Sequence, residues 1–200
     1  TTVSLAGAGV ANVTGSAQAD TINVAETGDV THVINGGAGT DTLNIAVKAG
    51  FDDVNDITAV ENINITVKAG DAVDIDEGDF TTGVENIKIL GGNSLSTFTT
   101  GSLVTEIKTL DASGFGGNIV ATLANNVADS TFTITGGSLE TDELNYTMSA
   151  AGTDKLYATG IETLDLSFTT ASSTLDLANA TGVKTIDVNV AAGITATLDS

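Results

Sequence analysis

The chain has 200 residues and carries 26 acidic residues against 6 lysines and no arginine, so its formal net charge is −20. This charge makes nucleic acid and anionic lipid poor partners, and no apolar run is long enough for membrane insertion. The 41% share of hydrophobic residues argues against disorder, and the absence of cysteine excludes disulfides. The chain does not begin with Met and shows no leader, so we expect a piece of a longer protein.

The first element in chain order is a glycine–aspartate motif that occurs twice. Residues 36–44 fit the nonapeptide G-G-x-G-x-D-x-U-x, where U is a large aliphatic residue, at every fixed position. Residues 15–23 keep the first glycine, the aspartate and the aliphatic residue. In a parallel β-roll this pattern is a calcium-binding turn followed by a short strand.

This motif predicts the first candidate calcium site. Ions in a roll sit between neighbouring turns, so we expect Asp20 and Asp41 to share a Ca²⁺ ion, because carboxylate and carbonyl oxygens are its preferred ligands. The other predicted ligands are backbone carbonyls near Gly36 and Ala38, with Asn35 or Asp29 completing the shell. The alternative interpretation is a plain glycine turn with a solvated aspartate.

Short segments with period-two alternation of apolar and polar residues follow, and each predicts a strand with one buried face. Turns between them must rely on glycine, Asn and Asp, because the chain has 23 glycines and no proline. The predicted strands are residues 43–47, 63–67, 87–89, 132–134, 144–148, 164–168, 175–177 and 186–190.

Several of these strands share an aliphatic–polar–polar–aliphatic lead-in. The lead-ins begin at Val60, Val84, Ile161 and Val183, with spacings of 24 and 22 residues within the two pairs. Spacings of this size are typical of solenoids, in which each coil covers the hydrophobic edge of its neighbour. We therefore predict an all-β, right-handed parallel β-solenoid or β-roll with calcium turns. A β-sandwich is the alternative, since it also uses many short strands.

The two halves of the chain resemble each other. The lead-in at Val60 matches the one at Ile161, and residues 73–75 match residues 175–177 at a similar offset. We interpret residues 1–200 as a single solenoid segment built from two similar halves, about 1–100 and 101–200.

A second candidate calcium site lies in the second half. Residues 136–145 have one residue too many between the glycine pair and Asp142, and residues 152–156 lack the glycine pair. Asp142 and Asp154 nevertheless keep the Asp-x-aliphatic position, so both are predicted ligands.

Two further acidic segments have different interpretations. Residues 71–79 fail the EF-hand spacing and predict a strand with a charged outer face. Asp52, Asp53 and Asp56 lie in a loop specific to the first half and are candidates for a surface cation site that bridges molecules.

No catalytic constellation is evident. His32 is the only histidine, there is no cysteine, and no nucleophile elbow, phosphate loop or zinc-binding histidine pair is present. We therefore expect no enzymatic activity in this segment.

With these motifs in view, residues 15–47 resemble the opening of a repeats-in-toxin (RTX) segment of bacterial surface-layer (S-layer) proteins. The run 159–166 is similar to the "TGVETLNL" phrases that recur in those chains, and the composition, rich in Thr, Ala, Gly, Val and Asn, is also typical of them. The chain departs from the family pattern in having one intact nonapeptide instead of several in tandem.

The resemblance implies a structural protein exported by type I secretion, which folds outside the cell in millimolar Ca²⁺. It also implies self-assembly of identical subunits into a two-dimensional lattice on the cell surface, held by cell-surface polysaccharide. Two alternatives stay open at this point: a module of a large calcium-dependent RTX adhesin, and a non-catalytic part of a secreted hydrolase.

Overall fold

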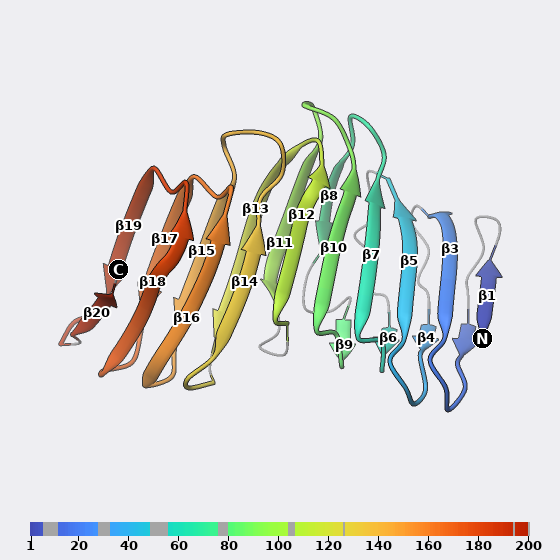
Figure 1. Cartoon of the computed structure of the whole chain (residues 1–200), viewed down its shortest axis with the longest axis horizontal. Helices are drawn as coiled ribbons and strands as arrows, with labels where there is room; N and C mark the ends of the chain where they lie inside the picture. The colour runs from blue at the N-terminus through green and yellow to red at the C-terminus, as the bar shows by residue number, and fades with distance from the viewer. Residues whose placement is uncertain are drawn as a thin grey trace.

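The computed structural model describes residues 1–5, 12–27, 33–48, 56–75, 80–103, 107–125, 127–193 and 195–199. Within these ranges every regular element is a β-strand and no helix occurs. All pairings between neighbouring described strands are parallel, as in the pair of strands that places Thr42 opposite Asn62. Figure 1 shows the strands stacked side by side from β1 at one end to β20 at the other. The fold is a parallel β-solenoid, as predicted, and not a sandwich.

The strands form three sheets. The ten-stranded sheet runs the full length, in the order β1 (Thr2–Leu5), β3 (Thr21–Thr27), β5 (Thr42–Val47), β7 (Asn62–Val67), β10 (Asn86–Gly91), β12 (Thr109–Phe115), β14 (Thr131–Thr135), β16 (Gly152–Thr159), β18 (Ser173–Thr181) and β20 (Ala196–Asp199). The four-stranded sheet contains β2 (Asn12–Thr14), β4 (Val33–Asn35), β6 (Asp56–Thr58) and β9 (Phe80–Thr82). The six-stranded sheet contains β19 (Thr185–Val190), β17 (Thr163–Phe168), β15 (Glu143–Met148), β13 (Asn118–Asn125), β11 (Thr97–Leu103) and β8 (Ala72–Ile75).

The two smaller sheets complete the coils in different parts of the molecule. The four-stranded sheet accompanies the N-terminal coils, whereas the six-stranded sheet accompanies the coils from β8 onward. Strands β8 and β9 follow each other in the chain between β7 and β10, so both smaller sheets contribute to that coil.

The core lies between the sheets and follows the predicted alternation. In β5, Leu43, Ile45 and Val47 are buried while the residues between them face outward. The same inward positions recur in each predicted strand except β19, where Ile186 and Val188 are each 46% exposed. Burial of these aliphatic columns is the main favourable contribution to the free energy of folding.

Matching segments of the two halves fall in different sheets. Strands β5, β7 and β10, which follow the first-half motif and lead-ins, belong to the ten-stranded sheet. The counterparts of β7 and β10 by their lead-ins, β17 and β19, belong to the six-stranded sheet. Strands β10 and β12 follow the coil of β8 and β9 and still lie in the ten-stranded sheet, so the change of sheet between matching lead-ins falls later in the chain, before β17.

Candidate functional site

The predicted calcium residues of the first half lie at the corner that precedes the ten-stranded sheet. Asp20, Asp41 and Glu61 occupy this corner in three successive coils, just before β3, β5 and β7. The N–H of Asp20 donates to Oδ1 of Asp41 (2.7 Å), and the N–H of Asp41 donates to Oε2 of Glu61 (2.6 Å). Each of these two acceptor side chains therefore binds the backbone of the preceding coil. We call this row the first acidic ladder.

Asp41 carries one of the two buried carboxylate oxygens of this ladder that have no hydrogen-bond partner among the described residues, the other being Oδ1 of Asp20. The side chain of Asp41 is fully buried, and its Oδ2 has no hydrogen-bond donor among the described residues. A buried carboxylate oxygen without a partner costs free energy, because it has lost its hydration without a replacement. A bound cation is one way to remove that cost.

Asp20 is also buried but has more contacts. Its Oδ2 accepts bonds from the N–H (2.5 Å) and the hydroxyl (2.9 Å) of Ser16, and Oδ1 lies 2.5 Å from the Thr1 nitrogen. Two carboxylate groups of adjacent coils thus meet at one corner.

The glycines of the two turns bring backbone oxygens close to these carboxylates. A Cβ at Gly36 would lie 1.9 Å from the carbonyl oxygen of Ala59 and 2.6 Å from Oδ2 of Asp41. A Cβ at Gly15 would lie 1.9 Å from the carbonyl oxygen of Gly36 and 2.9 Å from Oδ2 of Asp20. Only glycine permits this approach. The result is a cluster of carboxylate and carbonyl oxygens, the donor set that suits Ca²⁺.

Asn35 and Ala38, the other predicted ligands, lie in the same turns. Oδ1 of Asn35 accepts the N–H of Gly37 (2.9 Å), so this side chain closes its own turn. The N–H of Ala38 donates to the carbonyl of Ser16 (3.0 Å) and joins the two glycine turns. The structure therefore brings Asp20, Asn35, Gly36, Ala38 and Asp41 together at one corner of two adjacent coils.

Carboxylates and histidines alone do not form a metal cage in this structure. Over the described ranges, no group of three or more His, Cys, Asp or Glu side chains is arranged to hold a metal ion. The residues at the first corner fit Ca²⁺ only if backbone carbonyls supply part of the shell. The unpartnered Oδ2 of Asp41 and the adjacent carbonyl oxygens meet that requirement.

Asp142 has the corresponding corner position in the second half, before β15, but both its oxygens are satisfied. Oδ1 accepts the N–H of Ile119 (2.8 Å) and Oδ2 accepts the N–H of Gly137 (2.6 Å), while its own N–H donates to Oε2 of Glu162 (3.0 Å). Burial raises the pKa of Asp142 and the nearby Glu162 adds to the rise, although the two N–H donors oppose it. Two backbone N–H groups therefore satisfy both oxygens of this buried carboxylate.

Asp154, the other ligand predicted in the second half, belongs to a separate buried network. Its Oδ2 accepts bonds from the Tyr146 hydroxyl (2.8 Å) and from Nδ2 of Asn125 (2.7 Å), and its Oδ1 accepts the N–H of Ser130 (3.0 Å). Burial and the charge of Asp154 raise the pKa of Tyr146, so its hydroxyl keeps its proton. Three donors therefore replace water around this carboxylate.

The structure does not bring Asp142 and Asp154 together. Asp142 contacts Ile119 near the start of β13, whereas Asp154 contacts Asn125 at its end. Six residues of an extended strand span about 20 Å. The two aspartates therefore lie at opposite ends of the coil and cannot share one ion.

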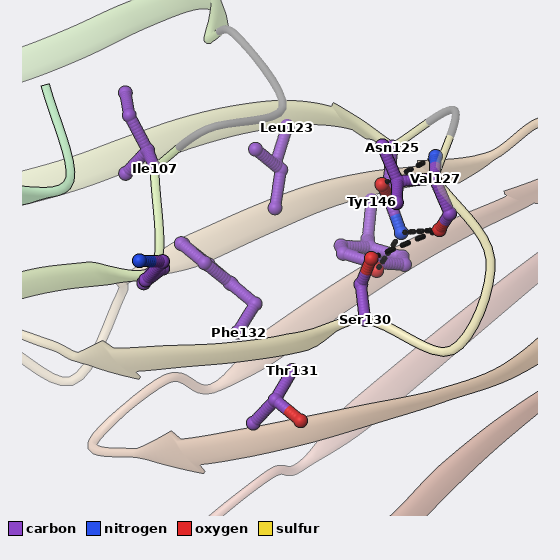
Figure 2. A pocket seen from close by; sticks show the side chains of 9 residues that line it. Ile107, Leu123, Asn125, Val127, Ser130, Thr131, Phe132 and Tyr146 are labelled. Carbon is purple, nitrogen blue, oxygen red and sulfur yellow. Dashed lines mark hydrogen bonds between the residues drawn. The ribbon is translucent and has the colours of Figure 1, made fainter. Parts of the chain in front are cut away.

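A cavity of about 360 Å³ opens beside the Asp154 network. Figure 2 shows its apolar side chains, among them Ile107, Leu123 and Phe132, with Asn125 and Tyr146 next to them. The dashed bonds show that the Asn125 amide binds the Val127 backbone and the Tyr146 hydroxyl. The Asn125 amide and the Ser130 and Tyr146 hydroxyls at this cavity are thus already engaged in hydrogen bonds.

The remaining predictions fall at other places. Asp29, His32, Asp52 and Asp53 lie outside the described residues, and Asp56 is exposed at the start of β6. In the segment 71–79, the structure describes β8, where Val73 and Ile75 are buried and Asp74 faces outward. This part of the segment is the predicted alternating strand.

Sequence reasoning missed Glu61, Glu162, Asn125 and Tyr146. The two glutamates occupy the same place in their lead-ins, and that shared place was the available signal for the acidic ladder. Asn125 and Tyr146 gave no signal, because their role depends on a contact with Asp154 across the core.

Comparison with protein-family models, curated proteins and solved structures gives no match for this chain. Within the described part of the chain, no helix has the length and apolar character needed to cross a membrane.

Proposed function

We propose that this chain is a calcium-stabilised structural segment of a secreted surface-layer protein, which forms a two-dimensional lattice on the cell surface. The observation that carries the proposal is the buried, unpartnered Oδ2 of Asp41 beside Asp20 and two backbone carbonyls. Type I secretion and attachment through cell-surface polysaccharide are parts of the same proposal.

Asp20 and Asp41 would hold the ion with the carbonyls of Gly36 and Ala59. Bound Ca²⁺ supplies positive charge to buried carboxylates and links two adjacent coils. Hydrogen bonds already orient both carboxylates: the Ser16 N–H binds Asp20, and the Asp20 N–H binds Asp41. The glycines leave room for the carbonyl oxygens to approach them. The site is therefore built from oxygens that belong to neighbouring turns.

The charge of the chain gives this binding a role in export. At −20 the compact state repels itself, and this repulsion favours the unfolded chain where Ca²⁺ is scarce. Outside the cell, an ion that binds only the folded state adds stability by mass action, about 2.7 kcal/mol at a concentration of 100 Kd. Folding would then follow secretion.

The test compares thermal unfolding of the wild type, Asp41→Asn and Asp165→Asn in chelator and in millimolar Ca²⁺, with Mg²⁺ as the ion control. Asp165 is an exposed aspartate on the outer face of β17, so its substitution changes the net charge equally. We expect Ca²⁺ to raise the Tm of the wild type and of Asp165→Asn, and to have little effect on Asp41→Asn. In chelator, Asp41→Asn should equal or exceed the wild type, because it removes a buried unpaired charge.

The same titration followed by light scattering examines assembly. Particle growth that is specific to Ca²⁺ and reversed by chelator supports the lattice. If Ca²⁺ shifts the Tm of all three proteins equally, the ion binds elsewhere and the assignment of Asp41 is wrong.

A further inference from the structure

We propose that the outer face of β3, β5 and β7 is a contact surface for a second copy of this chain, which packs through the same face. The inference rests on the proposed function and names the surface through which its subunits associate. We call this surface the Thr/Asn face. It consists of the outward-facing residues Thr21, Asn23, Ala25, Thr42, Asn44, Ala46, Asn62, Asn64 and Thr66.

The first argument is charge. No residue of the Thr/Asn face is charged, in a chain with a net charge of −20. The outer side of the six-stranded sheet differs, since Glu143, Asp165 and Asp187 lie there on β15, β17 and β19. Two copies approach with the least electrostatic repulsion when their uncharged faces meet.

The second argument is rigidity. Nδ2 of Asn44 donates to Oδ1 of Asn23 (2.7 Å), and Nδ2 of Asn64 donates to Oδ1 of Asn44 (2.7 Å). This ladder fixes the amides before any partner arrives, so little side-chain entropy is lost on association. Strands β5 and β7 pair without a register shift, so Asn44 and Asn64 stand directly side by side in one column of the sheet.

The third argument is shape. A hollow of about 320 Å³ lies beside the asparagine ladder, and its lining includes Ala25, Ala46 and Thr66. Asn23 and Asn44 of the ladder line the same hollow, and because asparagine is larger than alanine, we infer that the ladder forms a ridge beside a trough at Ala25 and Ala46. A two-fold axis parallel to the ladder places the ridge of each copy in the trough of the other. Such an isologous contact is self-complementary and closed.

The test substitutes Ala46→Lys, which fills the trough with a charged side chain without removing a buried contact. Ala124→Lys is the matched control, because Ala124 is an equally half-buried, outward-facing alanine on β13 of the other sheet. Sedimentation velocity in millimolar Ca²⁺ over a concentration series measures self-association, and circular dichroism checks that all three proteins are folded. We expect Ala46→Lys to raise the dimer Kd by about tenfold or more, and Ala124→Lys to leave it unchanged.

Two outcomes overturn the inference in distinguishable ways. If the wild type associates and Ala46→Lys associates equally well, the Thr/Asn face is wrong and the structural function stands. If the folded wild type stays monomeric at every concentration, the inference fails together with self-assembly by this segment. Binding of purified surface polysaccharide by a monomeric wild type, weakened in Ala46→Lys, would assign the face to a glycan instead.

Discussion

At the scale of single residues, the four buried aspartates show how one side chain is accommodated in different ways. Asp142 and Asp154 are served by backbone, amide and hydroxyl donors, whereas Oδ2 of Asp41 has no donor in the part of the chain that the structure describes. The sequence motif places all of them at an Asp-x-aliphatic position. Their surroundings, not the motif, decide which carboxylate oxygen is left without a hydrogen-bond donor.

The Asp154 network gives a prediction at this scale. Tyr146→Phe removes one of the donors to a buried carboxylate, so we expect it to lower the free energy of unfolding by about 1–3 kcal/mol. Tyr157→Phe is the control, because Tyr157 is 39% exposed on β16. Urea unfolding of both variants provides the measurement. Equal effects of the two substitutions would show that the hydroxyl of Tyr146 contributes no special stabilisation.

At the scale of elements, the burial of an inward side chain depends on whether its strand has a neighbour on both sides. β17 pairs with β15 and β19, and Leu164 is fully buried between them. β19 is the last strand of its sheet among the described residues, and its inward side chains remain partly exposed. The contribution of one inward aliphatic residue to stability should therefore depend on its coil.

This difference is measurable by two matched truncations. Leu164→Ala leaves a cavity in a closed core, and we expect a loss of about 2–5 kcal/mol. Ile186→Ala at the register partner in β19 should cost clearly less, because that side chain is 46% exposed. Denaturant unfolding at one Ca²⁺ concentration compares them. A cost at Ile186 as large as that at Leu164 would mean that β19 is covered in solution.

Sequence reasoning predicted the strands and the solenoid correctly, because both follow from patterns within short stretches of the sequence. The alternation of Leu43, Ile45 and Val47 and the spacing of the lead-ins were enough for the strands and the solenoid. Strands such as β12 and β16 were missed, because Gly114 and Asp154 interrupt their apolar pattern. The Asp142–Asp154 pairing failed for a different reason: Asp142 directly precedes β15, whereas Asp154 is an inward-facing residue within β16, and the two contact opposite ends of β13.

At the scale of the whole molecule, the acidic excess and the raised pKa of Asp142 both make the folded state more stable as the pH falls from neutral. The folded protein holds a proton on Asp142 more firmly than the unfolded chain does, so stability increases as pH falls from neutral toward the usual aspartate range. Protonation of other carboxylates also reduces repulsion. Asp111 acts oppositely: burial alone would raise its pKa, but bonds from Ser113 and Lys88 lower it, so its contribution is lost only below the usual aspartate range.

We therefore expect the Tm in chelator to rise on mild acidification to about pH 5 and to fall again in strong acid. Thermal unfolding from pH 7 to pH 3 measures the curve, and Asp142→Asn should reduce the rise of the Tm on acidification toward the usual aspartate range. A Tm that falls steadily from neutral pH would contradict this balance.

The division of one side of the solenoid into two sheets has a mechanical consequence. The ten-stranded sheet is continuous from β1 to β20, whereas the opposite side is interrupted between β9 and β8. A load applied across the long axis meets an unbroken series of hydrogen bonds on one side and a seam on the other. The rod should therefore bend most easily at the coil of β8 and β9, with the continuous sheet as its hinge.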